Sequence, residues 1–125
     1  MKDHRIPIGK PLAGIEMNVS SIRFSFMNPI VELCAPFIFH SSVTDQTTSE
    51  KFDPWERTGD LNLLWRLLDV HASHIQMDDE SFRLKFDCGI VLECINQGGA
   101  PELVLIWGGE SPEGGIILTR YPEDL

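Results

Sequence analysis

One segment of the chain occurs twice, sixty residues apart. The first copy is residues 21–34, SIRFSFMNPIVELC, and the second is residues 81–94, SFRLKFDCGIVLEC; the two align without a gap. Each copy alternates apolar and polar residues, turns at Asn-Pro or Cys-Gly, and returns through a second apolar stretch, which is typical of a β-hairpin. The repeat therefore predicts two hairpin-based halves, about 12–58 and 73–121, within a single domain, 1–125.

The hydrophobic periodicity predicts about seven short strands. Ile22, Phe24 and Phe26 fall on one face of the first strand, with the period of two expected of a half-buried strand. Pro36 has no amide donor, so we expect it to interrupt or bulge the second strand, which then resumes at a sheet edge. Residues 1–11 are expected to form a loose lead-in. The strands are predicted at residues 20–26, 30–39 with the interruption, 73–77, 82–86, 90–95, 103–107 and 116–120.

A single helix is predicted between the two copies, at about residues 60–70. Asp60 or Thr58 can cap it, since either side-chain oxygen can accept an amide of the first turn. Apolar residues cover most of its circumference, so we expect sheet on more than one side. The predicted fold class is α+β, with a mostly antiparallel curved sheet around this central helix. A small β-barrel or sandwich plugged by the helix is the alternative.

Residues 41–58 form a long polar stretch rich in serine, threonine and aspartate. We predict a loop here, and loops of this length in compact domains are often functional. Trp55 is a large apolar side chain within this polar stretch. It either folds back to close the end of the core or is exposed as an anchor for a partner.

No motif for catalysis or metal binding is complete in this sequence. His71 and His74 are spaced i, i+3, but neither Cys-x-x-Cys nor His-Glu-x-x-His accompanies them. We expect His71 to interact with the C-terminal carbonyls of the helix, and His74 to face solvent or a neighbouring strand. Cys88 follows Asp87, whose negative charge disfavours a thiolate. The sequence thus predicts no enzyme, no cofactor and no metal.

The cysteines and the N-terminus indicate a cytoplasmic protein. Three cysteines without a spaced framework fit reduced thiols better than disulfides. Cys34 and Cys94 occupy equivalent positions of the repeat and are expected to be small core residues. The N-terminal residues lack the apolar core of a secretory signal, and no apolar run has the length that crosses a bilayer.

The charge is negative and unevenly distributed. The net charge is −9; residues 1–44 carry four basic and three acidic residues, and the remainder carries six basic and sixteen acidic residues. Such a field repels phosphate backbones and anionic lipids, so neither nucleic acid nor membrane is an expected partner. It attracts basic proteins, at rates that fall with salt.

In its size, its acidity and its lack of a signal segment or catalytic motif, the chain resembles the small cytoplasmic immunity proteins that bacteria pair with polymorphic or contact-dependent growth-inhibition toxins. Residues 73–107, with an acidic turn, the run FRLKFDCG and then VLEC, are also similar to an uncharacterised bacterial family of small β-rich domains. The resemblance implies an inhibitor that sequesters a cognate toxin domain, typically a basic nuclease. Such an inhibitor presents carboxylates where phosphates bind, with an aromatic anchor at the centre.

Two acidic segments carry the residues expected to bind the toxin. The first lies in the long polar stretch and the second in the turn before the repeated hairpin. We expect the protein to be a monomer or a weak homodimer. The predicted toxin-binding residues are Asp45, Glu50, Asp53, Trp55 and Glu56 in the first segment and Asp78, Asp79 and Glu80 in the second.

Two other kinds of function remain open at this point. One is a small-ligand-binding or enzymatic site between helix and sheet, with His71, His74 and Cys88 at its mouth. The other is a structural module that dimerises through the helix or through the edge strand near Pro36.

Overall fold

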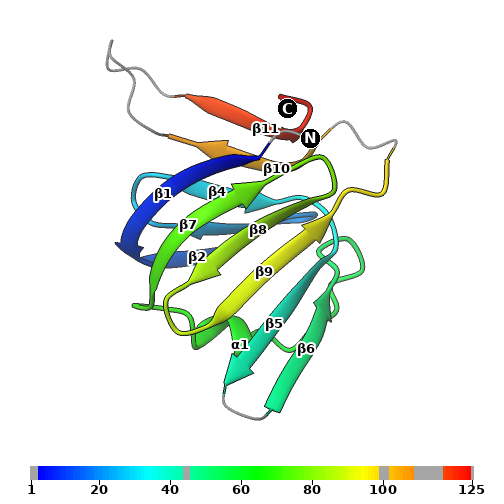
Figure 1. Ribbon diagram of the computed structural model, residues 1–125. Coiled ribbons are helices and arrows are strands. Elements are labelled where there is room, and N and C mark those ends of the chain that lie inside the picture. Colours follow the sequence, from blue (N-terminus) through cyan, green and yellow to red (C-terminus); the bar gives the residue numbers. More distant parts are fainter. Residues whose placement is uncertain (1–2, 44–45, 99–101, 109–116, 125) are drawn as a thin grey trace.

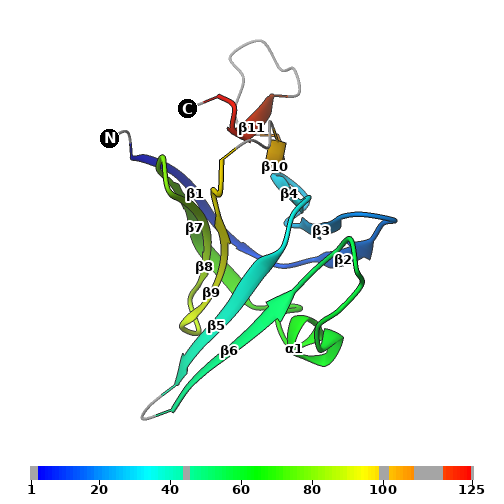
Figure 2. The same ribbon diagram turned by 90° about the vertical axis from the view of Figure 1, so that its right-hand side faces the viewer.

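The computed structural model describes residues 3–43, 46–98, 102–108 and 117–124. Within these ranges the chain is mostly β, with two antiparallel sheets and one short helix (Figure 1). The sheets have six and five strands and form two layers that are roughly β-sandwich-like and do not close into a barrel (Figure 2). The elements are β1 (His4–Pro11), β2 (Gly14–Met17), β3 (Ile22–Ser25), β4 (Ile30–Leu33), β5 (Phe37–Val43), β6 (Gln46–Phe52), α1 (Leu61–Trp65), β7 (His71–Met77), β8 (Ser81–Phe86), β9 (Ile90–Ile95), β10 (Glu102–Trp107) and β11 (Leu118–Pro122).

The mostly antiparallel architecture is confirmed, but the predicted α+β fold around a central helix is wrong. The described residues form eleven strands instead of about seven. The helix is short and lies at one end of the sandwich, next to β6 (Figure 2). The sandwich that we kept as an alternative is therefore closer to the observed fold.

The repeated hairpin is confirmed, with one copy in each sheet. β3 pairs with β4 in the five-stranded sheet, whose order is β11-β10-β4-β3-β2. β8 pairs with β9 in the six-stranded sheet, whose order is β1-β7-β8-β9-β5-β6. The two halves do not each form one sheet. Strands β5 and β6 leave the first half for the six-stranded sheet, and β10 and β11 leave the second half for the five-stranded one.

The two copies differ in register by one residue. Arg23 lies opposite Glu32 in the first copy, whereas Arg83 lies opposite Glu93 in the second. The gapless alignment of the sequence places Leu92, not Glu93, at the position of Glu32. Because successive residues of a strand point to opposite faces, this shift reverses the orientation of every side chain on the return strand.

The cysteines show this reversal. Cys94 is buried in the core, as predicted. Cys34 is only half-buried, and the prediction that it is an equivalent core residue is wrong. Cys34 and Cys94 occupy the same position in the aligned sequences. They occupy different positions relative to the opposite strand of their own hairpins.

The core lies between the two sheets and is rich in phenylalanine. Phe24 of the five-stranded sheet packs edge-on against Phe37 of the six-stranded one, with ring centroids 6.2 Å apart. Phe26 and Phe86 make a second contact between the layers, at 6.1 Å. Each buried side chain of this size contributes about 1.5–3 kcal/mol. The alternation of apolar residues in both hairpins thus supplies the two inner faces.

The helix ends earlier than predicted. It spans Leu61–Trp65, and Asp60 is its N-cap, as predicted, since the Asp60 carboxylate accepts an amide of the first turn at 3.0 Å. Beyond the helix, Leu68 forms a parallel bridge with Leu12, and the Asp69 amide donates to the Leu12 carbonyl at 2.9 Å. Main-chain bonds to the segment after β1 therefore replace the last predicted turns of helix.

Two segments that we predicted to be irregular are strands. The lead-in is β1, which pairs with β7 at one edge of the six-stranded sheet. Much of the predicted loop 41–58 belongs to the β5–β6 hairpin, which is paired from Phe37 and Phe52 to Val43 and Gln46. Thr48 and Ser49 are exposed yet compatible with a strand, because threonine favours extended backbone.

Pro36 interrupts the chain, as predicted, but the strand that follows is not at an edge. Residues 34–36 separate β4 from β5. Strand β5 belongs to the other sheet, where it lies between β9 and β6. The interruption is thus the point at which the chain crosses from one layer to the other.

Candidate functional site

Trp55 lies on a surface groove at one end of the six-stranded sheet. The groove has a volume of about 410 Å³. The start of β5, the end of β9 and the loop after β6 bound it. Pro36, Ile38, Lys51, Trp55, Ile95 and Leu103 are among the residues that line it.

The core accommodates Phe52 and leaves Trp55 outside. Phe52 is 0% exposed and stacks on Phe37 with ring centroids 5.2 Å apart, whereas Trp55 is 56% exposed. Asp53 and Thr58 exchange main-chain hydrogen bonds of 3.1 and 3.2 Å, which close the loop that carries the tryptophan. Of the two alternatives left by the sequence, the structure therefore shows the exposed tryptophan.

The first acidic cluster is Glu50, Asp53 and Glu56, around this loop. The Asp53 carboxylate accepts the main-chain amides of Trp55 at 2.9 Å and of Glu56 at 3.2 Å. Glu50 accepts the amide of Asp60 at 3.1 Å, and the side chain of Glu56 is exposed. Two of the carboxylates thus hold the loop in place. Asp45, which we also predicted to bind the toxin, lies outside the described residues.

The second acidic cluster is Asp78, Asp79 and Glu80, in the turn between β7 and β8. The Asp78 carboxylate accepts the amides of Ser81 at 2.9 Å and of Glu80 at 2.8 Å, and these bonds hold the pKa of Asp78 below its usual range. The side chains of Asp79 and Glu80 are exposed. Asp78 therefore shapes the turn, and its two neighbours face solvent.

The turn that carries the second acidic cluster is tied to the groove. Asn96 joins the second cluster to it: its main-chain amide donates to the Glu80 carbonyl at 2.7 Å, and its side chain donates to the Asp79 carbonyl at 3.0 Å. Gly98, which lines the groove, donates its amide to the Asn96 side chain at 3.0 Å. The first cluster is linked to the groove only through the loop: Asp53 accepts the Trp55 amide but lines a different pocket, and Glu50 accepts the Asp60 amide. The second cluster is therefore the one tied directly to the groove.

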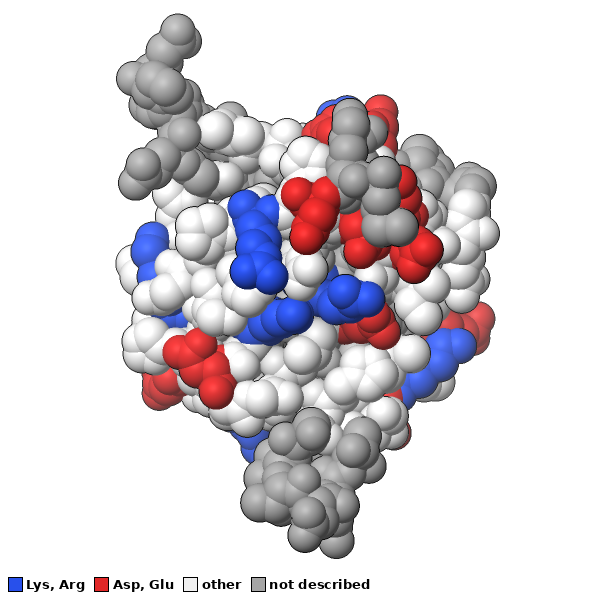
Figure 3. All heavy atoms as spheres, in the orientation of Figure 1, with Lys and Arg blue, Asp and Glu red and all other residues white. Residues whose placement is uncertain are grey.

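Among the described residues, the carboxylates of both clusters lack ion pairs, although Arg83 interacts electrostatically with Asp78 and Glu80. No lysine, arginine or histidine in the described part of the chain forms an ion pair with any of them. Figure 3 shows acidic residues gathered at the upper right, toward the end of the sheet that carries the β7–β8 turn, and basic residues across the middle of the sheet. On this face, one group of acidic residues therefore lies toward that end of the sheet, and others lie at the lower left and at the right edge.

Two charged residues, Glu93 and Lys51, also line the groove. The Glu93 carboxylate bonds to Arg83 at 2.9 Å and to His40 at 3.3 Å. It is therefore already bound by two side chains of the same sheet. Lys51 adds a positive charge to the lining. The lining of the groove thus contains one negative and one positive side chain.

The sequence analysis missed the apolar lining of the groove. Ile38 lies between the buried Phe37 and Phe39, so alternation along β5 places it on the outer face. This alternation was the only signal for it. Ile95 and Leu103 come from other segments and meet Ile38 only in the folded sheet.

The histidines and Cys88 do not assemble a site. His71 and His74 lie on β7, a strand, so their i, i+3 spacing does not place them on one helical face. No group of three or more potential metal ligands occurs among the residues that the structure describes. His71 does not cap the helix as predicted, because α1 ends at Trp65. Cys88 is exposed in the turn between β8 and β9.

The other two thiols are poor nucleophiles. Burial raises the pKa of Cys34 to about 11, with the Glu32 charge adding to the effect. Burial likewise raises the pKa of Cys94 to about 12. Both thiols are protonated at neutral pH, and the thiolate is the reactive form.

Two further findings bear on the identity of the protein. Among the described residues, no helix combines the length and the apolar character needed to span a bilayer. Comparison with known protein families, with curated proteins and with solved structures finds no match.

Proposed function

We propose that this protein is an immunity protein that binds a basic toxin domain through the Trp55 groove and the two acidic clusters beside it. One observation carries the proposal: an exposed tryptophan lines a groove that is tied to a turn with exposed carboxylates, and no described basic residue forms an ion pair with those carboxylates. The proposed partner is the active domain of a cognate toxin, such as a nuclease whose phosphate-binding surface is basic. Bound there, the inhibitor blocks access of the substrate.

The groove and the tryptophan supply the affinity in this proposal. Tryptophan is enriched among interface residues whose truncation costs 2 kcal/mol or more, roughly a 30-fold loss of affinity. Trp55 is held by a closed loop, so little entropy is lost when a partner packs on it. Ile38 and Ile95 add apolar surface beneath it.

The acidic clusters supply the rate and the selectivity. Glu56, Asp79 and Glu80 have exposed side chains and are the proposed contacts with basic residues of the toxin. Asp53 and Asp78 act indirectly, because their carboxylates accept amides of the loop and of the turn. Charges at the rim of an interface accelerate association and make it sensitive to salt.

The test uses the protein encoded by the gene next to that of this chain. Both proteins are purified, their binding is measured by calorimetry, and growth is measured when the neighbour is expressed with and without this chain. We expect tight binding and rescue of growth. The variant Trp55→Ala should weaken binding about 30-fold or more. Trp65→Ala is the matched control, because Trp65 is 62% exposed on α1, outside the groove.

The charge contribution is tested by association rates at low and high salt. Asp79→Asn combined with Glu80→Gln should slow association and reduce its salt dependence. Asp87→Asn, in the exposed turn between β8 and β9, should change neither. A neighbour that does not bind, or a Trp65 variant as impaired as the Trp55 variant, would overturn the proposal.

A further inference from the structure

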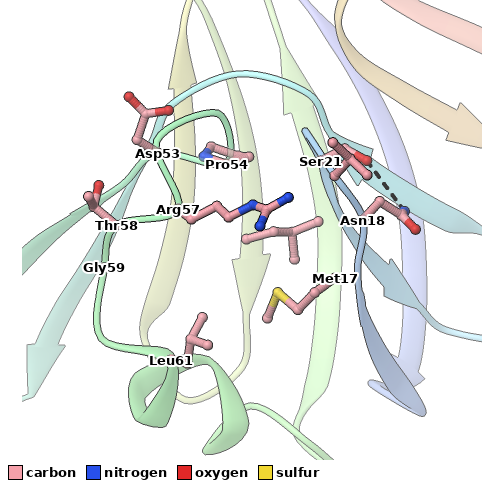
Figure 4. Close-up of a pocket in the computed structure, with 11 residues that line it drawn as sticks. Met17, Asn18, Ser21, Asp53, Pro54, Arg57, Thr58, Gly59 and Leu61 are labelled. Carbon is pink, nitrogen blue, oxygen red and sulfur yellow. Dashed lines mark hydrogen bonds between the residues drawn. The ribbon is translucent and has the colours of Figure 1, made fainter.

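A second cavity lies on the other side of the loop that carries Trp55. It has a volume of about 420 Å³ and shares no lining residue with the Trp55 groove. Its walls are the β2–β3 hairpin, the loop 53–59 and the first residue of α1 (Figure 4). A cavity of this size falls within the usual range for small-molecule sites, roughly 300–1,000 Å³.

The lining is mostly apolar, and a cation reaches into it. Met17, Val19 and Leu61 are exposed apolar side chains on its walls. The Arg57 side chain extends from the loop across the cavity toward Met17 and Ser21 (Figure 4). Mostly apolar walls with a few placed polar or charged groups are the usual composition of a small-molecule pocket, and here the charged groups are Arg57 and Asp53.

Arg57 differs from the arginines that the fold uses. Arg23, Arg83 and Arg120 each pair with a carboxylate. Within the described part of the chain, Arg57 forms no ion pair and no side-chain hydrogen bond, although Asp53 lines the same cavity. Its guanidinium therefore keeps its full set of donors for a ligand.

The backbone of Arg57 has a φ of 58°, in the left-handed region that favours glycine, as do those of Met27 and Asp69. The main-chain bonds between Asp53 and Thr58 hold the loop closed around Arg57.

The opposite wall is closed as well. The Asn18 amide donates to the Ser21 carbonyl at 2.9 Å, and the Asn18 side chain donates to the Ser21 hydroxyl at 3.4 Å. Both walls are thus fixed before a ligand arrives. Binding to such a preformed cavity costs little ordering entropy.

From these observations we propose that the cavity binds a small-molecule monocarboxylate with an apolar body, and that Arg57 pairs with the carboxylate. At about 30 Å³ per atom, the volume share of water in the liquid, 420 Å³ accommodates roughly fourteen non-hydrogen atoms. One guanidinium beside Asp53, in a chain of net charge −9, suits a single negative charge better than a phosphate dianion. This site does not depend on the proposed toxin binding.

The probe is decanoate, a medium-chain fatty acid, with decanol as its uncharged analogue and decyl phosphate as the dianion. Binding is followed by NMR of the protein labelled at the methionine methyl groups. Met17 lines the cavity, Met27 is exposed elsewhere and Met77 is buried in the core. We expect decanoate to shift the Met17 methyl signal saturably and to leave those of Met27 and Met77 in place. Decanol should bind about tenfold more weakly or worse.

Two substitutions at Arg57 separate binding from folding. Arg57→Gln removes the charge, and Arg57→Gly removes the side chain while suiting the left-handed backbone, so this variant folds. Both should weaken decanoate binding about tenfold or more. Arg66→Gln, which removes the same charge at the end of α1 and outside the cavity, should bind decanoate as the unaltered protein does.

Four results would overturn the proposal. They are an unmoved Met17 signal at saturating decanoate, equal affinity for decanol, undiminished binding by the glycine variant, and tighter binding of decyl phosphate than of decanoate. None of these results bears on the toxin-binding test, which alters Trp55, Asp79 and Glu80, because none of those residues lines this cavity. The two proposals therefore stand or fall separately.

Discussion

Glu32 is a charged side chain that the fold buries, with 8% of it exposed. It accepts a hydrogen bond from the Ser21 hydroxyl and pairs with the Arg23 guanidinium, Nε to Oε1, at 3.2 Å. The same guanidinium lies over the Trp107 ring, 4.6 Å from its centroid. At the scale of single residues, this network is the polar link between the three neighbouring strands β3, β4 and β10.

We predict that Glu32→Ala lowers the free energy of unfolding by about 2–3 kcal/mol. The substitution leaves the Ser21 hydroxyl and the Arg23 guanidinium without their acceptor. Urea denaturation monitored by tryptophan fluorescence measures the effect. Glu16→Ala is the control, because Glu16 is an exposed partner of the same arginine, at 3.8 Å, and its loss should cost less than about 0.5 kcal/mol. Equal losses in the two variants would contradict the assignment.

At the scale of elements, the β7–β8 turn depends on the Asp78 carboxylate. The two amides that it accepts, from Ser81 and Glu80, favour the charged form and lower the pKa of Asp78. A carboxyl group whose pKa is lower in the folded protein stabilises the fold at pH values above its unfolded pKa of about 3.9. That contribution is lost as the pH falls through the folded pKa.

We therefore expect Asp78→Ala to cost about 1 kcal/mol at pH 7 and progressively less as the pH is lowered below about 3.9. Urea denaturation at pH 7 and at successive acidic pH values measures the difference. Asp79→Ala, one residue along the same turn, has an exposed side chain and should change stability by less than about 0.5 kcal/mol at either pH. A loss for Asp78→Ala that does not depend on pH would show that the charge is not involved.

The repeated hairpin shows how a turn sets the faces of a strand. Four residues separate the paired Ser25 and Ile30 in the first copy, whereas five separate the paired Lys85 and Val91 in the second. The extra residue in the turn moves the return strand by one position in register. Hence Arg23 meets Glu32, while its counterpart Arg83 meets the glutamate one residue further along.

At the scale of the whole molecule, the three thiols differ in burial, so their labelling rates measure how the sandwich opens. Cys88 is exposed, Cys34 is half-buried, and Cys94 is 1% exposed with its pKa raised to about 12 by burial. Labelling requires a thiolate that the reagent can reach. The thiol of Cys94 meets both conditions only when the core opens.

We predict that a thiol reagent at pH 8 modifies Cys88 first and Cys94 last. If the two sheets unfold as one unit, the labelling rate of Cys94 should rise with urea with the slope of global unfolding. Mass spectrometry of digested samples assigns each modified cysteine. In the Cys88→Ser variant the slow labelling of Cys94 should be unchanged. If Cys94 were labelled as fast as Cys88, the prediction that the two sheets unfold as one cooperative unit would be wrong.

The candidate site was predictable only in part. The sequence singled out Trp55 and both acidic clusters, because large apolar groups and unpaired charges stand out in polar segments. It left the exposure of Trp55 open, since the choice between Phe52 and Trp55 for the core depends on how β6 pairs with β5. Residues from distant segments form both the apolar lining of the groove and the cavity at Arg57. No local sequence pattern predicts either of them.

By itself the sequence determined the two hairpins, the apolar faces that form the core and the excess of negative charge. These follow from side-chain alternation, turn residues and composition, which act over a few neighbouring residues. Only the tertiary structure decided which sheet each strand joins, where the helix ends and that the turn of the second acidic cluster is tied to the Trp55 groove. Those features depend on main-chain hydrogen bonds between distant segments, and such bonds are available to almost any residue and leave little trace in a single sequence.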